Sequence, residues 1–418
     1  MRDRFLFAVV VAGLIPAAFA SRSGTHLNPV VDLLAAHKPV FGVYAPRNPR
    51  ARPGGAPVAD TVRQKTPTEL AKDALGYTAA DYIFDGSMEG DFDRAFPAFS
   101  EFAKGIAEAG GGMIDRRAGG GFHHPLIVKM HEIAPDPAKA VQHIADQLDL
   151  GVSGVVFVGV ESPEEVKTGL AAMRFKANGG TRRDDVGKAP AYWGVSEKEY
   201  REKADLWPLN PKGELVNFTI VESKAGLARV REIAAVKGIG VLFPGAGTLR
   251  GVFTTTDATG QRVFDEKAWE AAIQQVLAAC KEFNVPCGYP ATANDIEARM
   301  QQGFSVFVIN WGEQGFKAVD IGRRVGNRES GIGGALRAPG NRPGNRERRR
   351  QQTRYAIPGA VVQIPNAAGD RRRDCGYRGT RAVAPRHRPR QCERRSHPRC
   401  GRRATRQRWW RCRTNDHR

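Results

Sequence analysis

Short apolar runs alternate with longer amphipathic segments eight times along the chain, between about residue 38 and residue 324. The runs are four to seven residues long and rich in valine, isoleucine and phenylalanine, which is typical of strands buried on both faces. The expected strands are Pro39–Tyr44, Tyr82–Asp85, Leu126–Met130, Gly154–Val160, Asn217–Glu222, Gly240–Phe243, Val285–Tyr289 and Ser305–Asn310.

Each run is followed by a segment whose apolar positions recur with the period of a helix. An N-cap threonine, a proline and a capping acid mark the start of the first, in Thr66-Pro67-Thr68-Glu69. Alternation at this spacing predicts a parallel sheet, and eight repeats predict an α/β fold of the closed (β/α)8 TIM-barrel type. The expected helices are Leu70–Leu75, Asp93–Glu108, Pro137–Leu148, Ser162–Phe175, Ser196–Leu206, Lys224–Val236, Glu266–Phe283, Thr292–Gln302 and Glu313–Arg324.

The carboxyl ends of the strands and the loops that follow them carry the reacting groups of such a barrel. Here these positions hold acidic, basic and histidine side chains above an apolar interior. They predict a polar site for a small anionic substrate, with a hard metal ion as an option. The positions are Asp85–Glu89, Lys129–Glu132, Glu161, Glu222, Pro244–Thr248, Tyr289 and Asn310.

The charge is divided unevenly along the chain. Residues 325–418 contain 26 Arg, no Lys and 6 acidic residues, whereas residues 1–324 contain 38 basic and 38 acidic side chains. A neutral body argues against nucleic acid as its partner. For the tail two interpretations stay open. It is either an arginine-rich arm that binds polyanions, with Trp409 and Trp410 as stacking groups, or a foreign or shifted reading frame.

The first 20 residues have the pattern of an export signal. Arg2 and Arg4 precede an apolar run, and Ala18-Phe19-Ala20 forms an A-x-A cleavage site. We therefore expect a periplasmic protein that begins at Ser21, with an uncleaved start and a cytoplasmic location as the alternative. No segment is expected to span a membrane. The expected segments are a signal peptide at 1–20, a lead-in at 21–37, the barrel at 38–324 and a disordered, non-native tail at 325–418.

Six cysteines add little to this picture. The four in the tail have no CxxC spacing, which excludes an ordinary zinc module. Cys280 and Cys287 do not make a disulfide framework on their own. We expect them to pack as small apolar residues at the end of one helix and the start of the next strand.

Several strand-end motifs occur together in a characteristic order. They are Asp81–Gly86, Met88–Gly90, Leu150–Ser162, Tyr192–Gly194, Phe218–Ser223, Gly238–Gly245 and Pro286–Pro290. With these motifs, the chain from about Lys38 to Arg324 resembles the HpcH/HpaI aldolase and citrate lyase family. The resemblance implies a barrel of the phosphoenolpyruvate/pyruvate type, a homo-oligomer, and a class II aldolase that uses Mg²⁺ or Mn²⁺ to act next to pyruvate-like enolates.

The resemblance also assigns residues, and three of them depart from the family pattern. Glu222 matches the metal-binding glutamate, unless it caps the next helix or pairs with Lys224. Ala246 stands where the family has a second metal-binding aspartate. Gly90 follows Glu89 where the family has a histidine, and Lys129 replaces the arginine that binds the substrate carboxylate.

Nearby residues offer substitutes. Lys129 can hold a carboxylate as a point charge, and His131 or Glu89 can move a proton. For His131 the alternative is a surface loop residue. Glu161 is either a second metal ligand or the start of a helix. The turn with Gly245, Ala246 and Gly247 can bind the substrate through backbone N–H groups.

These interpretations lead to three hypotheses. The first is a carbon–carbon lyase that acts on a 2-oxo or hydroxy acid. The second is an altered barrel that binds a small organic acid without turnover, because Ala246 and the missing histidine change the family's machinery. The third is a protein that binds polyanions through its basic tail, with affinity that falls steeply as salt increases.

Overall fold

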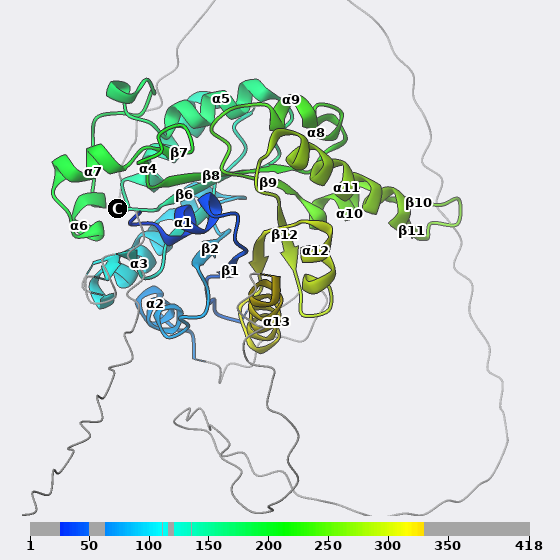
Figure 1. The fold of residues 1–418 in the computed structure, drawn as a ribbon, viewed down its shortest axis with the longest axis horizontal. Helices are drawn as coiled ribbons and strands as arrows, with labels where there is room; N and C mark the ends of the chain where they lie inside the picture. The colour runs from blue at the N-terminus through cyan, green and yellow to red at the C-terminus, as the bar shows by residue number, and fades with distance from the viewer. Residues whose placement is uncertain (1–25, 50–62, 111, 116–120, 135, 330–418) are drawn as a thin grey trace, which may run out of the picture. The chain divides into compact units, whose positions relative to one another are not determined.

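A computed structural model describes residues 26–49, 63–110, 112–115, 121–134 and 136–329 (Figure 1). The predicted signal peptide and nearly all of the predicted tail lie outside these residues, so both stay predictions. Among the helices of the described residues, none is long and apolar enough to cross a membrane.

All eight expected strands are present, and they pair in parallel. The sheet follows the order of the chain, because each strand lies beside its predecessor and the last strand pairs with the first. The strands are β1 (Val40–Tyr44), β2 (Tyr82–Asp85), β5 (Leu126–Lys129), β6 (Gly154–Phe157), β8 (Leu215–Val221), β9 (Val241–Pro244), β12 (Gly288–Ala291) and β13 (Val306–Ile309).

The sheet is curled (Figure 1). Its two end strands, β9 and β12, are joined by a single parallel bridge between Leu242 and Cys287, and the Leu242 amide donates to the Pro286 carbonyl at 3.0 Å. The predicted α/β fold with a parallel curled sheet is therefore confirmed, while full barrel closure depends on this one bridge.

Side chains alternate between the two faces of every strand. One set fills the inside of the curl, and the other packs under the surrounding helices. Tyr82 crosses the inside, where its hydroxyl donates to the Phe307 carbonyl at 2.9 Å. Gly42 makes room for this ring, since a Cβ there would lie 2.5 Å from Tyr82 Cε1. The inside is therefore a packed core of large side chains.

Helices surround the curled sheet (Figure 1). Two of them, Pro137–Leu148 and Glu266–Phe283, coincide with their predicted bounds. The predicted capping box at Thr66 is formed, with Glu69 Oε2 accepting from the Thr66 backbone N–H at 2.8 Å. The helices that follow the strands are α2 (Pro67–Leu75), α3 (Phe92–Gly110), α4 (Pro137–Leu148), α5 (Pro163–Ala172), α7 (Glu197–Lys203), α8 (Lys224–Ala228), α9 (Val230–Ala234), α11 (Glu266–Phe283), α12 (Ile296–Gln302) and α13 (Glu313–Glu329).

The other seven predicted helices differ in extent, five of them by one to four residues at an end and two by more. The segment expected as one helix from Lys224 to Val236 forms α8 and α9, which break at Arg229. Helix α13 continues five residues past the predicted end at Arg324, because Val325 is buried against the core.

Several short elements had no counterpart in the prediction. Helix α1 packs its apolar residues against the inner core of the sheet. These elements are α1 (Pro29–Ala35), the 3-10 turn η1 (Lys176–Asn178), α6 (Ala189–Trp193), α10 (Ala246–Val252), β3 (Ile114–Asp115), β4 (Gly121–Phe122), β7 (Leu206–Trp207), β10 (Thr254–Thr256) and β11 (Arg262–Phe264).

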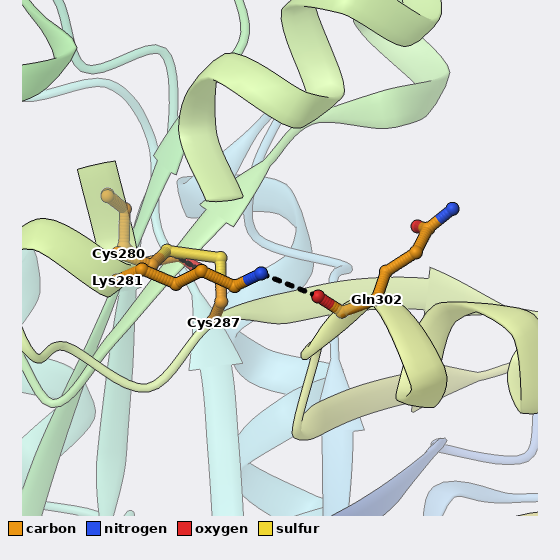
Figure 2. The surroundings of a disulfide bond; sticks show 5 residues. Cys280, Lys281, Cys287 and Gln302 are labelled. Carbon is orange, nitrogen blue, oxygen red and sulfur yellow. Dashed lines mark hydrogen bonds between the residues drawn. A yellow bond between two sulfur atoms is a disulfide. The ribbon is translucent and has the colours of Figure 1, made fainter. Parts of the chain in front are cut away.

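Cys280 and Cys287 form a disulfide (Figure 2), so the expectation that they pack unbonded is wrong. Between them the chain leaves α11 through Asn284 in the left-handed conformation and turns back toward β12. This turn brings the two Cα atoms to 5.6 Å, within the usual range for a disulfide. The bond lies where β12 approaches β9, next to the bridge between Leu242 and Cys287.

Candidate functional site

A cavity of about 190 Å³ opens at the carboxyl ends of the strands, and every one of the eight parallel strands contributes to its wall. Most of the lining is apolar because it belongs to the inner face of the sheet. Lys129 and Glu222 are the charged side chains among the described lining residues. The wall consists of Tyr44, Phe84, Lys129, Val156, Phe218, Ile220, Glu222, Phe243, Pro244, Gly245, Ala246, Gly247, Thr248, Pro290 and Val308.

Lys129 brings a positive charge into this cavity. It is the last residue of β5, and its side chain is 14% exposed. The Nζ atom donates to both carboxylate oxygens of Glu89, at 2.8 and 2.9 Å. Glu89 lies in the loop after β2 and is 40% exposed, so the loop carries a carboxylate to the edge of the cavity.

Glu89 also contacts His131. The Nδ1–H of His131 donates to the Glu89 backbone carbonyl at 3.0 Å, which leaves Nε2 as the basic nitrogen of the neutral ring. His131 is exposed and is not part of the cavity wall. The structure therefore brings together the three residues predicted as catalytic, Lys129, His131 and Glu89, with Glu89 in contact with both others.

Tyr44 is a site residue that the sequence reasoning missed. It ends β1, and its Cε1 and Lys129 Cδ lie 3.5 and 3.6 Å from where a Cβ on Gly86 would stand, so the two side chains flank the same glycine. Burial raises the pKa of the Tyr44 hydroxyl, and the nearby Lys129 ammonium opposes this effect. The hydroxyl therefore keeps its proton at neutral pH. Its position at a strand end was the signal that could have found it.

Glu222 is held at the cavity wall by backbone contacts. It directly follows β8 and is buried, and its Oε1 accepts from the Gly159 amide at 2.9 Å. Gly245 packs against it so closely that a Cβ there would lie 2.5 Å from Glu222 Oε2. The following helix is capped by Ser223, whose Oγ accepts from the Gly226 amide at 3.0 Å, so Glu222 is not the cap.

The other predicted ligand, Glu161, lies elsewhere. Its side chain is exposed and accepts from the Ser223 hydroxyl at 2.6 Å, and it does not line the cavity. The predicted substrate-binding residues Gly245, Ala246 and Gly247 do line it. Ala246 begins helix α10, and the indole Nε1–H of Trp269 donates to its carbonyl at 2.8 Å.

The side chains of this site do not fit a ready-made site for Mg²⁺ or Mn²⁺. Hard cations bind oxygen ligands, and the described part of the wall offers one carboxylate, Glu222. Ala246 has no oxygen to add from its side chain, and both Glu89 oxygens bind Lys129. Among the described residues no group of three or more His, Cys, Asp or Glu could hold a metal ion. The metal therefore stays a prediction.

Comparisons with known proteins agree with the predicted resemblance. The sequence model of the HpcH/HpaI aldolase/citrate lyase family matches residues 119–320, while no curated protein matches the chain.

The fold was also compared with solved structures. A HpcH/HpaI aldolase/citrate lyase family protein from Burkholderia cenocepacia J2315 is 18% identical, covers 74% of this chain and 99% of its own, and has a TM-score of 0.49. An HpcH/HpaI aldolase from Desulfitobacterium hafniense DCB-2 is 15% identical, covers 74% of this chain and 98% of its own, and has a TM-score of 0.46. The citrate lyase beta subunit from M. tuberculosis, complexed with oxaloacetate and magnesium, is 14% identical, covers 70% of this chain and 99% of its own, and has a TM-score of 0.39. From the family match, this chain carries an HpcH/HpaI aldolase/citrate lyase domain over residues 119–320.

Proposed function

We propose that this protein is a carbon–carbon lyase that breaks or forms the bond next to the pyruvate-like enolate of a 2-oxo or hydroxy acid. The observation that carries the proposal is the Lys129 ammonium in the wall of an apolar cavity at the carboxyl end of the sheet. The family domain adds the reaction class, since its members are lyases.

The cavity suits a small acid. At about 190 Å³ it is smaller than the pockets of about 300–1,000 Å³ that enclose drug-sized ligands. A carboxylate enters apolar surroundings only when a partner replaces its lost hydration. Lys129 supplies that partner as a positive charge, and the apolar wall strengthens the attraction because it excludes water.

Making or using an enolate also requires proton transfer. Glu89 is in direct contact with Lys129 Nζ, and His131 directs its basic Nε2 away from the Glu89 carbonyl. Either side chain can accept the proton that enolate formation releases, and Tyr44 can donate one back. We assign the role of proton acceptor to Glu89, because it lies next to the cavity wall while His131 is exposed.

Isotope exchange tests the proposal without knowledge of the full substrate. The full chain is incubated with pyruvate in deuterated water, with Mg²⁺, with Mn²⁺ or with a chelator, and methyl exchange is followed by NMR. We expect exchange well above the buffer rate and a loss of at least about 100-fold in Lys129→Met. Lys139→Met is the matched control, since Lys139 pairs with Asp93 on the surface at 3.3 Å. No exchange under any condition would refute the proposal.

A second candidate is a barrel that binds a small acid without turnover. Ala246 favours it, because the position carries a methyl group where the family has an aspartate. The two candidates differ in one readout. A binding protein would give saturable heat with pyruvate in calorimetry and no methyl exchange, whereas the lyase gives both.

We also propose that the protein works outside the cytoplasm, as a homo-oligomer of closed barrels. Residues 1–20 support export, and the Cys280–Cys287 disulfide fits an oxidising compartment. Cell fractionation with detection of a mature chain that begins at Ser21 tests the location, and light scattering of the purified protein tests the assembly. Recovery of the full-length chain in the cytoplasm would contradict export.

A further inference from the structure

Lys129 differs from the lysines that form surface ion pairs. Its side chain is 14% exposed, compared with 53% for Lys139 and 64% for Lys167. Its Nζ donates to the Glu89 carboxylate, and the Lys129 side chain forms part of the cavity wall. An amine in this setting has a proton acceptor within hydrogen-bond distance, and the cavity beside it has room for a small carbonyl substrate.

The ligand set of the cavity leaves a chemical requirement unfilled. Breaking a bond next to a 2-oxo group needs an acceptor for the electron pair of that bond. The wall offers one carboxylate and the methyl group of Ala246, which does not assemble a metal site. A positively charged carbon–nitrogen double bond accepts the same electron pair. Among the described residues of the cavity wall, Lys129 has the primary amine that can form such a bond.

We propose that Lys129 Nζ forms an iminium with the 2-oxo carbon of the substrate and that this iminium is the electron acceptor of the reaction. The inference rests on the proposed lyase function and specifies its chemistry. The class of substrate it implies is a 2-oxo acid with an unhindered ketone, because the carbon must come within bonding distance of Nζ.

The bond changes balance without an oxidant or a reductant. Glu89 takes one proton from the ammonium, and the amine lone pair attacks the ketone carbon while the carbonyl oxygen gains a proton. That proton comes from the nitrogen, and Glu89 then returns its own proton to the resulting hydroxyl, which leaves as water when the nitrogen lone pair forms the double bond. The sum is an ammonium and a ketone giving an iminium and water. The positive charge therefore stays at Nζ, next to the substrate carboxylate.

Cleavage and release follow from the same atoms. The electron pair of the breaking bond moves into the iminium and gives a neutral enamine, while the substrate hydroxyl gives its proton to the Glu89 carboxylate and becomes the carbonyl of the leaving aldehyde. The enamine carbon then takes a proton, for which Tyr44, whose ring flanks Gly86 together with Lys129, is the donor, and the proton held by Glu89 restores the Tyr44 hydroxyl. Water hydrolyses the iminium and restores the Lys129 ammonium.

Borohydride trapping tests the inference directly. The full chain is mixed with pyruvate and a chelator, reduced with sodium borohydride, digested, and mapped by mass spectrometry. We expect one reduced pyruvyl adduct, on Lys129. It should be absent in Lys129→Arg, which keeps the charge but not the nucleophile, and retained in Lys139→Arg, a matched change in a surface ion pair.

A second variant examines the role of Glu89. Glu89→Gln keeps the shape beside Nζ but cannot take its proton, so adduct formation should slow by about 100-fold at neutral pH and recover as pH rises. A merely structural role would not produce that pH dependence. Adduct formation by Glu89→Gln at the wild-type rate would remove Glu89 from the mechanism and overturn the proton-transfer step.

The two proposals fail in different ways. Methyl exchange that continues without any trapped adduct, or that a chelator abolishes, overturns the iminium and leaves the lyase function in place. An adduct spread over surface lysines also overturns the iminium at Lys129. The absence of both exchange and adduct overturns the lyase function, and the iminium with it.

Discussion

Replacing Gly245 by alanine should disturb the site through one contact. The new Cβ would overlap Glu222 Cβ and lie 2.5 Å from Oε2 and 3.0 Å from Cδ. Rotation of the carboxylate alone cannot relieve this overlap, because it includes the first atom of the Glu222 side chain. Either the end of β8 or the start of α10 must shift. Overpacking of this kind destabilises proteins by about 1–3 kcal/mol.

Gly247 provides a matched control. It lines the same cavity one residue into helix α10, yet a Cβ at Gly247 would have no atom within 4 Å. Alanine there should stabilise the protein by about 0.5–1 kcal/mol, since it restricts the unfolded chain and favours helix. Gly245 has φ −73°, which alanine also adopts readily. Both changes therefore restrict the unfolded chain alike. Because Gly245 is the N-cap of α10 and Gly247 lies inside it, their difference combines the clash with Glu222 and a helix contribution of about 1 kcal/mol.

Equilibrium unfolding in urea measures this difference. With the midpoint and slope fitted for each variant, we expect Gly245→Ala to be less stable than Gly247→Ala by about 2–4 kcal/mol. Gly245→Ala should also weaken pyruvate binding, because the Glu222 carboxylate and α10 can no longer keep their places. Equal stability of the two variants would refute the close packing of Gly245 on Glu222.

Three further predictions concern the scaffold. Cys287→Ser opens the loop closed by the Cys280–Cys287 disulfide and should lower the unfolding free energy by about 2 kcal/mol, an effect that reductant should reproduce in wild type but not add to in the variant. Burial lowers the pKa of His124 from 6.5 to about 4, so the unfolded chain binds a proton that the folded chain refuses. The contribution of His124 to the unfolding free energy should be full above pH 6.5 and should fall by up to about 1.4 kcal/mol per pH unit toward pH 4. Urea unfolding midpoints measured between these pH values should depend less on pH in His124→Gln than in wild type. Thr66→Ala removes the cap of α2 and should lower the unfolding free energy by about 1 kcal/mol, whereas Thr66→Ser should change it little.

The strands were predictable because the sheet is buried on both faces. Residues such as Val155 and Val156 face opposite cores, so both must be apolar, and the strand appears as a continuous apolar run. Helix starts were predictable where a local cap exists, as at Thr66 and Asp136. These features depend on neighbours in sequence, which is why they could be recognised without coordinates.

Other elements depend on partners far away in the chain. Helix α1 is capped by Asn28, whose backbone N–H donates to Glu214 Oε2 at 2.9 Å, 186 residues away. Helix α10 begins in a glycine-rich segment of low helix propensity, and the distant Trp269 binds its first carbonyl. The disulfide likewise required the turn at Asn284, which the sequence pattern did not reveal. Tertiary contacts decided each of these.

The candidate site was predictable only to the level of strand ends. Barrel geometry correctly gathers Lys129, Glu89 and His131 at one edge, but the contacts among them follow from how the loop after β2 folds. Glu161 shows the limit of the rule, because it follows a strand and still lies outside the cavity wall. Side-chain direction beyond the strand is set by the loop, and no periodicity encodes it.

The junction between β9 and β12 connects the disulfide with the cavity. At its amino end, Cys287 forms both the disulfide and the single bridge to Leu242. At its carboxyl end, Pro244 and Pro290 form part of the cavity wall. Elsewhere in the sheet several paired residues hold each junction, so this one has the fewest backbone contacts to fix its geometry. The disulfide therefore does more than restrict the unfolded chain, because it anchors the strand that places one side of the cavity.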